Sequence, residues 1–414
     1  MTPERLELVE LGDAQEVQLP GPVAETLSAS GVVTVERLLH GDAYLVRPAN
    51  LVGVAVVAGI EVWIRPKVAI DRLLFLLGYA LSGKRWQDTH VPLAEEPDLL
   101  PAVAEAFVRQ ADRALREGVL HGYREVEASL PVLRGRIRES DQLRRRYGFP
   151  VPLEVRFDEF TVDIAENQLL LTATRRLQRL PRLSREVRHG LLRVAGRLDG
   201  VTPAAAGRPL PTWRPTRLNA RYHAAVRLAE MVLRATSMEL SPGVLQVDGF
   251  LVNMPQLFED FVTVALGEEI ERLGGRTHRQ APTWLDEADS VRMKPDLVWT
   301  SAAGAPRGVI DAKYKAEKPA GFPQADLYQL LAYCTALDLP VGHLVYAKGS
   351  GETERRHVIR GKGVEIVQHV LDLAQAPDSL LRQIKRIAAT VGDVQDFRSH
   401  LGNDRKPGPG ASEE

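Results

Sequence analysis

The sequence has almost no cysteine, since its 414 residues include only Cys334. One cysteine forms no internal disulfide, and by itself it supplies neither a cysteine-based zinc site nor an iron–sulfur cluster. A chain of this length is expected to hold two or three domains, each with a hydrophobic core of its own, so its stability does not require disulfides or structural metal sites. This cysteine usage indicates a reducing compartment, and we expect a cytoplasmic protein.

Long apolar runs are also missing. The N-terminal stretch "MTPERLELVELGD" carries acidic residues where an export signal has a positive segment followed by an apolar core. The longest strongly apolar run, "LVGVAVVAGI", has ten residues and is too short to cross a bilayer as a helix. We therefore expect a soluble chain with no membrane partner.

Neither sign of charge is in excess, since 53 Lys and Arg face 54 Asp and Glu, for a formal net charge of −1. Net charge alone therefore predicts no polyanion partner. The distribution is uneven, because the window from Leu171 to Thr236 holds fourteen arginines and three acidic residues. Such a local basic field suits the neutralisation of phosphates, and it is equally typical of a solvated helical face.

Hydrophobic periodicity divides the chain into four parts. Residues 1–66 alternate apolar and polar positions in short runs, which predicts a β-rich module. Residues 67–240 are predicted to be a mainly helical, Arg-rich region, suited to binding DNA or a partner protein. Residues 241–400 mix helical and strand patterns, and residues 401–414 form a polar Gly/Pro tail that we expect to be disordered. The fold class is therefore α/β, or α+β overall, with a mixed sheet flanked by helices in the C-terminal part.

Three local expectations can be checked directly. Val52–Val57 and Ile60–Ile64 flank Ala58 and Gly59, which predicts a β-hairpin. Residues 157–180, "FDEFTVDIAENQLLLTATRRLQRL", are predicted to be helical. Gly78–Arg85, "GYALSGKR", matches the phosphate-binding loop pattern except at Arg85, and it closes a predicted helix with Gly83 as its cap. We therefore expect the chain itself to hydrolyse no nucleotide.

The stretch "GVIDAKYK" carries the candidate chemistry. Side chains at i and i+2 of a strand face the same way, so Asp311 and Lys313 project together while Ala312 points to the packed face. Asp296 begins the preceding strand-like run, and antiparallel pairing across the intervening Gly/Pro turn is expected to bring it beside Asp311.

Two adjacent carboxylates repel each other unless a cation neutralises them. Mg²⁺, with Mn²⁺ as an alternative, prefers oxygen ligands and lowers the pKa of a bound water, while a neighbouring lysine stabilises negative charge on a phosphate. The pattern therefore predicts phosphodiester hydrolysis, although an Asp–Lys pair at a strand end also occurs without function. Gln329 and Tyr333 lie at i and i+4 on the next predicted helix, hence on one face.

These motifs carry a resemblance. "KPD", "GVIDAKYK" and "DLYQLLAY" resemble the PD-(D/E)xK nuclease superfamily, in the branch with a Q-x-x-x-Y helix. More closely, with "LVGVAVVAGIEVWIRPKV", "LRGRI", "FDEFTVDIAENQLLL" and "MPQLFEDFV", the chain resembles the McrC family, the nuclease subunits of modification-dependent McrBC restriction systems. The resemblance implies that residues 241–400 are a nuclease domain with an αβββαβ order of elements.

The resemblance also implies roles. Asp296 and Asp311 become metal ligands, Lys313 the catalytic lysine, and Gln329 with Tyr333 the supporting helix pair. Glu259 matches a further acidic ligand position, for which three neighbours are alternatives: Asp260, Glu268 and Glu269. The implied partners are methylated double-stranded DNA and an McrB-like AAA+ GTPase ring, whose GTPase the N-terminal half stimulates. Candidate arginines for that contact are Arg134, Arg136, Arg138 and Arg144 to Arg146.

Two other functions compete with this reading. A stand-alone nuclease of the same superfamily would cleave DNA without a motor ring, although the variety with a four-cysteine iron–sulfur cluster is excluded. A non-catalytic adaptor would activate a GTPase or bind DNA with an inactive metal site. Intact Asp296, Asp311 and Lys313 favour a working nuclease.

Overall fold

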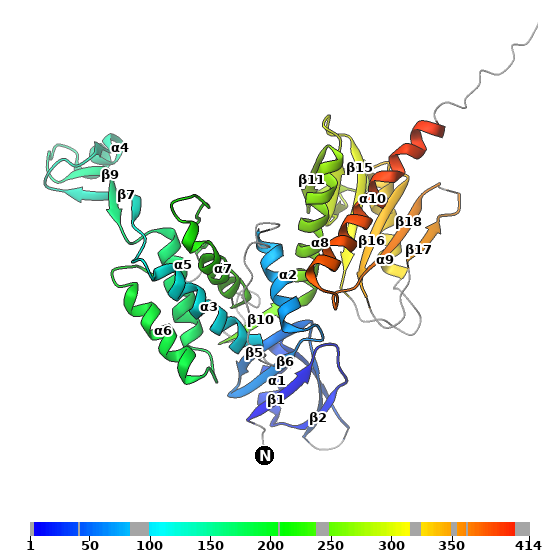
Figure 1. Cartoon of the computed structure of the whole chain (residues 1–414), viewed down its shortest axis with the longest axis horizontal. Helices are drawn as coiled ribbons and strands as arrows, with labels where there is room; N and C mark the ends of the chain where they lie inside the picture. Colours follow the sequence, from blue (N-terminus) through cyan, green and yellow to red (C-terminus); the bar gives the residue numbers. More distant parts are fainter. Residues whose placement is uncertain are drawn as a thin grey trace, which may run out of the picture. The chain divides into compact units, whose positions relative to one another are not determined.

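The computed structural model describes residues 4–39, 42–82, 99–205, 208–236, 248–314, 324–348, 354–361 and 363–401. The chain forms two compact units (Figure 1). The first unit comprises residues 1–52, 58–90 and 252–414, and the second comprises residues 53–57 and 91–251. Gly83 and the expected disordered tail lie outside the described residues. The four-part division drawn from the sequence stays a prediction.

The N-terminal module is rich in strands, as its alternating pattern predicts. Its elements are β1 (Arg5–Val9), β2 (Gln15–Gln18), α1 (Gly21–Ala29), β3 (Val33–Arg37), β4 (Ala43–Pro48), β5 (Leu51–Val57) and β6 (Ile60–Arg65). The strands form a sheet of order β2-β4-β3 and a sheet of order β1-β6-β5-β10, whose last strand is β10 (Asp248–Asn253).

The predicted hairpin is confirmed, because β5 and β6 are neighbours in the sheet. Its turn residues, Ala58 and Gly59, have φ values of 49° and 79°. Two successive residues with positive φ match the twist of the flanking strands.

Four helices build the body of the second unit. They are α3 (Leu99–Leu115), α5 (Ala165–Gln178), α6 (Arg185–Arg197) and α7 (His223–Thr236), with the short η2 (Ala220–Tyr222) before α7. Helices α3 and α5 each pack against both α6 and α7. The apolar faces that the sequence shows meet in a core that buries Phe107, Leu170 and Leu191 completely.

One expectation for this unit is wrong, because residues 157–180 are not one helix. Residues Leu153–Thr161 form strand β9, and the helix starts at Ala165. Strand β9 pairs along its whole length with β7 (Gly122–Leu130) and also with β8 (Arg136–Ile137), in the order β7-β9-β8. Partners some thirty residues away decide this conformation, which local periodicity does not reveal. The helix α4 (Glu139–Arg146) completes the small domain, called the finger below.

The first unit also contains a six-stranded mixed sheet of order β11-β14-β15-β16-β18-β17. Its strands are β11 (Arg276–Arg279), β14 (Leu297–Thr300), β15 (Pro306–Lys313), β16 (Val341–Ala347), β17 (Arg355–Val358) and β18 (Glu365–Leu371). A separate pair joins β12 (Thr283–Trp284) to β13 (Arg292–Met293). Pro295, which has no N–H to donate to a sheet, lies between β13 and β14.

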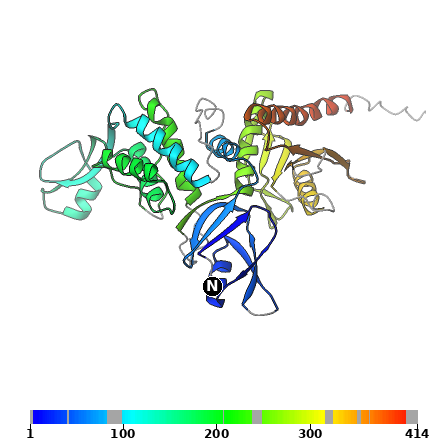
Figure 2. The same ribbon diagram turned by 60° about the horizontal axis from the view of Figure 1, so that its bottom comes forward.

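Helices cover both faces of this sheet (Figure 2). They are α8 (Met254–Ile270), followed by η3 (Glu271–Leu273), α9 (Gln324–Ala336) and α10 (Pro377–Leu401), while α2 (Ile70–Ser82) packs on α8. A Cβ at Gly308 would meet Val391 of α10, whereas one at Gly342 would meet Leu330 and Cys334 of α9. The two glycines face opposite ways, so α9 lies on one face and α10 on the other. No helix among the described residues is long and apolar enough to cross a membrane.

Candidate functional site

Asp311 and Lys313 lie at the end of β15, on one face of the strand as predicted. The Nζ of Lys313 is 2.5 Å from the Oδ2 of Asp311. The Asp311 side chain is 1 % exposed and that of Lys313 is 15 % exposed, while Ala312 is buried on the opposite face. The i, i+2 spacing therefore places a charged pair at the edge of the core.

Asp296 lies beside this pair, because β14 and β15 pair antiparallel as expected. The backbone N–H of Ala312 donates a hydrogen bond of 2.8 Å to the Oδ2 of Asp296. The carbonyl oxygen of Asp296 accepts a hydrogen bond from the N–H of Gln280 at 3.0 Å. The carboxylate is thus fixed at the open end of the β14–β15 hairpin, opposite the turn at residues 301–305.

The negative charges of Asp296 and Asp311 repel each other. Burial, reinforced by the charge of Asp296, raises the pKa of Asp311 to about 7. Burial likewise raises the pKa of Asp296, against the hydrogen bond from Ala312. Among the described residues, the Oδ2 of Asp311 interacts with the ammonium of Lys313, whereas its buried Oδ1 has no partner. A buried carboxylate with an unpartnered oxygen fits a divalent cation.

Lys313 remains an ammonium in this setting. Burial disfavours its charge, but the charges of Asp311 and Asp296 and the hydrogen bond to Asp311 outweigh burial and raise the pKa of Lys313. Its cation is therefore available at neutral pH to interact with a negatively charged group.

Glu259, on α8, is electrostatically coupled to the same pair. Burial raises the pKa of Glu259, the charge of Lys313 lowers it, and the charge of Asp311 raises it. Two of its alternatives have other partners, since Glu268 accepts a hydrogen bond from Tyr79 and Glu269 pairs with Arg272. In the part of the chain that the structure describes, no three or more His, Cys, Asp and Glu residues are grouped to hold a metal ion. The assignment of Glu259 as a further metal ligand stays a prediction.

The helix pair predicted on α9 is a hydrogen-bonded pair. The Nε2 of Gln329 donates to the hydroxyl of Tyr333 at 2.8 Å. That hydroxyl donates in turn to the carbonyl oxygen of Lys294 at 3.4 Å, two residues before Asp296. The pair therefore supports the segment that carries a candidate ligand.

Sequence reasoning missed three residues around the site. Asp326, on α9, is 3 % exposed, accepts a hydrogen bond from Tyr346 at 3.1 Å and helps to raise the pKa of Lys313. Its position three residues before Gln329, on the same helical face, was an available signal. The other two are Tyr314, which follows Lys313 in the chain, and Glu10, which accepts a hydrogen bond from Tyr314. No motif or spacing in the sequence connects Glu10 with the site.

A cleft of about 590 Å³ opens beside the carboxylates. Glu259, Asp296 and Arg279 are among its lining residues, with polar side chains of α8 and β11. This volume is in the range of small-molecule sites, and the guanidinium of Arg279 adds positive charge. The cleft is thus suited to an anionic group next to the aspartates.

The finger, in the second unit, offers another kind of surface. It exposes an unusual set of apolar side chains: Tyr123, Val132, Leu133, Ile137, Leu143, Tyr147, Phe149, Val151 and Phe160. Monomeric proteins seldom expose so many large apolar residues together, so this surface is typical of a protein interface.

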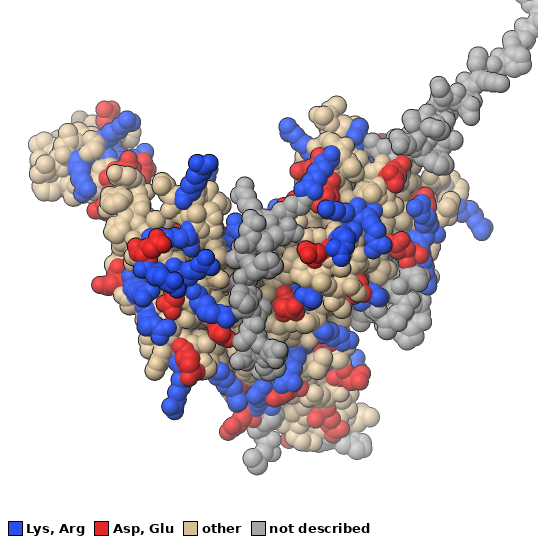
Figure 3. Space-filling view, in the orientation of Figure 1, with Lys and Arg blue, Asp and Glu red and all other residues tan. Residues whose placement is uncertain are grey.

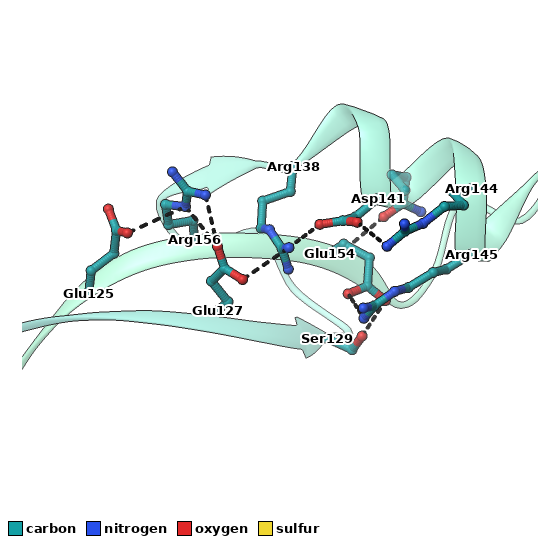
Figure 4. Close-up of polar contacts among 10 residues, drawn as sticks. Glu125, Glu127, Ser129, Arg138, Asp141, Arg144, Arg145, Glu154 and Arg156 are labelled. Atoms are coloured by element: carbon teal, nitrogen blue, oxygen red, sulfur yellow. Dashed lines mark hydrogen bonds and ion pairs between the residues drawn. The ribbon is translucent and has the colours of Figure 1, made fainter. Parts of the chain in front are cut away.

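Ion pairs link charged residues of the finger to one another (Figure 4). Arg138 pairs with Glu127 at 3.0 Å and also with Asp141, and Arg156 pairs with Glu127 at 2.8 Å. Among the six candidate arginines, the ion-paired ones are Arg138, Arg144, Arg145 and Arg146, and Arg134 stacks on Phe157. Arg136 is exposed and makes no ion pair with any described residue.

The Arg-rich window forms part of the helical body of the second unit. Figure 3 shows Lys and Arg side chains gathered over this body. Some of them are structural, since Arg193 pairs with Asp112 and Arg227 is 6 % exposed. Phosphate binding by the other arginines of this window stays a prediction.

The comparisons with known proteins agree with these features. The model of a family described as "McrBC 5-methylcytosine restriction system component" matches residues 46–347. A chain from the refined half-complex of the tetradecameric assembly of Thermococcus gammatolerans McrB AAA+ hexamers with bound McrC is 19 % identical, with a TM-score of 0.55. The alignment covers 94 % of this chain and 100 % of that one.

A second solved structure, the cryo-EM structure of the Thermococcus gammatolerans McrBC complex, contains a chain that is 20 % identical, with a TM-score of 0.39. That alignment covers 64 % of this chain and 88 % of the other. None of the curated proteins matches the chain.

Proposed function

Since the chain belongs to the family of McrBC 5-methylcytosine restriction system components, we propose that it is the subunit that cleaves DNA in such a system. The proposed reaction is Mg²⁺-dependent hydrolysis of phosphodiester bonds in methylated double-stranded DNA, with Mn²⁺ as an alternative ion. The observation that carries this proposal is the convergence of Asp296, Asp311 and Lys313 at one end of the β14–β15 hairpin.

Each of the three side chains has a part in this reaction. Asp296 and Asp311 would hold the ion, which when bound supplies positive charge to the scissile phosphate and a more acidic water. Asp311 is suited to this because one of its buried oxygens has no partner among the described residues. Lys313, kept charged by its acidic neighbours, orients the attacking water and meets the negative charge that develops on the phosphate.

The surrounding fold supports assignment to the PD-(D/E)xK nucleases. From α8 onward the elements of the main layer run α8, β11, β14, β15, α9, β16, which is the αβββαβ order of that superfamily. Gln329 and Tyr333 act on the segment before Asp296, as a supporting pair would. Glu259 contributes negative charge near Lys313 and is the candidate for a further ligand.

The proposed partner is an McrB-like AAA+ GTPase ring. The fold likeness to a chain from an assembly of McrB hexamers with bound McrC supports this partner. The exposed apolar side chains of the finger are a surface that such a ring would bury. We propose that the finger docks on the ring and stimulates its GTPase, while the first unit cleaves DNA.

The decisive experiment compares the wild-type chain with Asp311→Asn, each purified with an McrB-like AAA+ GTPase. Cleavage of methylated and unmethylated DNA is measured with GTP and Mg²⁺, and GTP hydrolysis is measured in parallel. We expect the variant to lose cleavage and to retain GTPase stimulation, because only cleavage uses the carboxylate. Loss of both activities, or of neither, would contradict the division between the two units.

The same assay separates the alternatives. Cleavage by the lone chain without GTP would favour a stand-alone nuclease. Stimulation of the GTPase by a wild-type chain that never cleaves DNA would favour a non-catalytic adaptor.

A further inference from the structure

Glu10 is a buried carboxylate at the end of the first strand of the chain. Its side chain is 0 % exposed. One oxygen accepts a hydrogen bond of 2.5 Å from the hydroxyl of Tyr314, and the other accepts one of 3.0 Å from the backbone N–H of Lys67. A buried carboxylate is tolerated only with such donors, so this arrangement is specific and costly to disrupt.

The partner of Glu10 adjoins the candidate nuclease site on two sides. Tyr314 directly follows Lys313 in the chain. Its ring lies 5.8 Å from the ring of Phe258, centroid to centroid, and Phe258 directly precedes Glu259 on α8. Tyr314 is therefore adjacent in sequence to one candidate site residue, Lys313, and its ring packs on the neighbour of another, Glu259.

The end of β15 needs this support. Among the described residues, the pairing of β15 with β16 ends at Lys313 and Tyr346, and Tyr314 lies just beyond it. The next residue is fixed by its hydroxyl on Glu10 and by its ring on Phe258. Without the hydroxyl contact, the last residue of the strand gains freedom, and its ammonium drifts from Asp311.

We propose that Glu10 and Tyr314 are positioning residues that hold Lys313 against Asp311 and beside Glu259. The N-terminal β-rich module is then part of the support of the nuclease site. The consequence for catalysis rests on the proposed function, whereas the consequence for the position of Lys313 does not.

The test uses three variants, Tyr314→Phe, Glu10→Leu and the double variant, in the full chain with its AAA+ partner. Tyr79→Phe is a matched control, because the hydroxyl of Tyr79 donates to a glutamate of α8, Glu268, at 2.7 Å. The control removes the same kind of bond, yet Glu268 is nine residues from Glu259, or about 13 Å along the helix.

Two readouts decide the proposal. The first is the rate of DNA cleavage at saturating Mg²⁺, together with the DNA concentration for half-maximal rate. The second is the reactivity of Lys313 toward an acylating reagent in the metal-free protein, measured by peptide mass spectrometry. We expect Tyr314→Phe to lower the rate about tenfold without changing the half-maximal DNA concentration, and to raise the labelling of Lys313 severalfold.

Glu10→Leu, which removes the acceptor of the Tyr314 hydroxyl, should reproduce both effects, and the double variant should be no worse than either single variant, because both act through one bond. Tyr79→Phe should change neither readout. Labelling of Lys313 that stays at the wild-type level in Tyr314→Phe, or equal effects of the control, would overturn the proposal. A wild-type complex that cleaves no DNA would refute the nuclease function instead, and the labelling would still decide whether Glu10 and Tyr314 position Lys313.

Discussion

Asp311→Asn is expected to stabilise the metal-free protein at alkaline pH while abolishing cleavage. The folded chain holds the pKa of Asp311 at about 7, against the ordinary 3.8 of an aspartate, because of burial and the charge of Asp296. The unfolded chain therefore binds fewer protons than the folded chain between about pH 4 and 7. Stability of the wild-type protein falls as pH rises through this window, and asparagine removes that loss.

The magnitude follows from the size of the shift. About three pKa units correspond to about 4 kcal/mol of strain above pH 7. This figure already includes the favourable ion pair with Lys313, which lowers the pKa of Asp311. Part of the gain is lost, because asparagine buries an amide group in place of the carboxyl group. We expect a net gain of about 2 kcal/mol at pH 8, which for a unit of this size raises the melting temperature by about 4 to 8 °C. At pH 5 the gain should vanish.

The assay is thermal unfolding in EDTA at pH 5 and pH 8, with Asp372→Asn as the control. The pKa of Asp372 is lowered, since the hydrogen bonds from Lys348 and Gln375 outweigh burial, so its replacement should reduce stability at both pH values. Addition of Mg²⁺ should raise the melting temperature of the wild-type protein and leave Asp311→Asn unchanged. A variant that is less stable than the wild-type protein at pH 8 would show that the ionised Asp311 does not destabilise the folded chain, and the reasoning would be refuted.

Three further outcomes are expected. Tyr333→Phe should lower the cleavage rate by about tenfold with unchanged GTPase stimulation, because it frees the carbonyl oxygen of Lys294 before Asp296; a rate equal to wild type would remove the helix pair from the support of the site. Arg136→Ala should weaken GTPase stimulation without affecting the metal-dependent stability of the first unit, with the ion-paired Arg144→Ala as a milder control in the same GTPase assay. EDTA should abolish cleavage by the assembled complex, because it removes Mg²⁺. Excess Mg²⁺ added afterwards should restore cleavage, whereas excess Ca²⁺ should not, and recovery with Ca²⁺ would argue against the proposed site.

The sequence predicts the candidate site better than it predicts the fold around it. The i, i+2 rule of a strand pairs Asp311 with Lys313, and the i, i+4 rule of a helix pairs Gln329 with Tyr333. The two rules join residues that are two and four positions apart, so no knowledge of the tertiary structure is needed. The antiparallel approach of Asp296 required only one further assumption, a short turn between two strands.

The misses are long-range. Residues 157–161 become a strand because β7 pairs with them, and β11 and β18 are defined by their partners in the six-stranded sheet. The clearest case is the bond between Glu10 and Tyr314, which joins residues 304 positions apart. No periodicity in the sequence links such positions, since only the packed core brings them together.

The β14–β15 hairpin has a practical use, because its turn and its carboxylates lie at opposite ends. Residues 302–307 are exposed, and the N–H of Ser301 bonds to the carbonyl oxygen of Ala305 at 2.8 Å. Asp311 lies five positions after Pro306 along the strand, a span of roughly 17 Å. A fluorophore attached in this turn would therefore report on the first unit during assembly without disturbing the reacting groups.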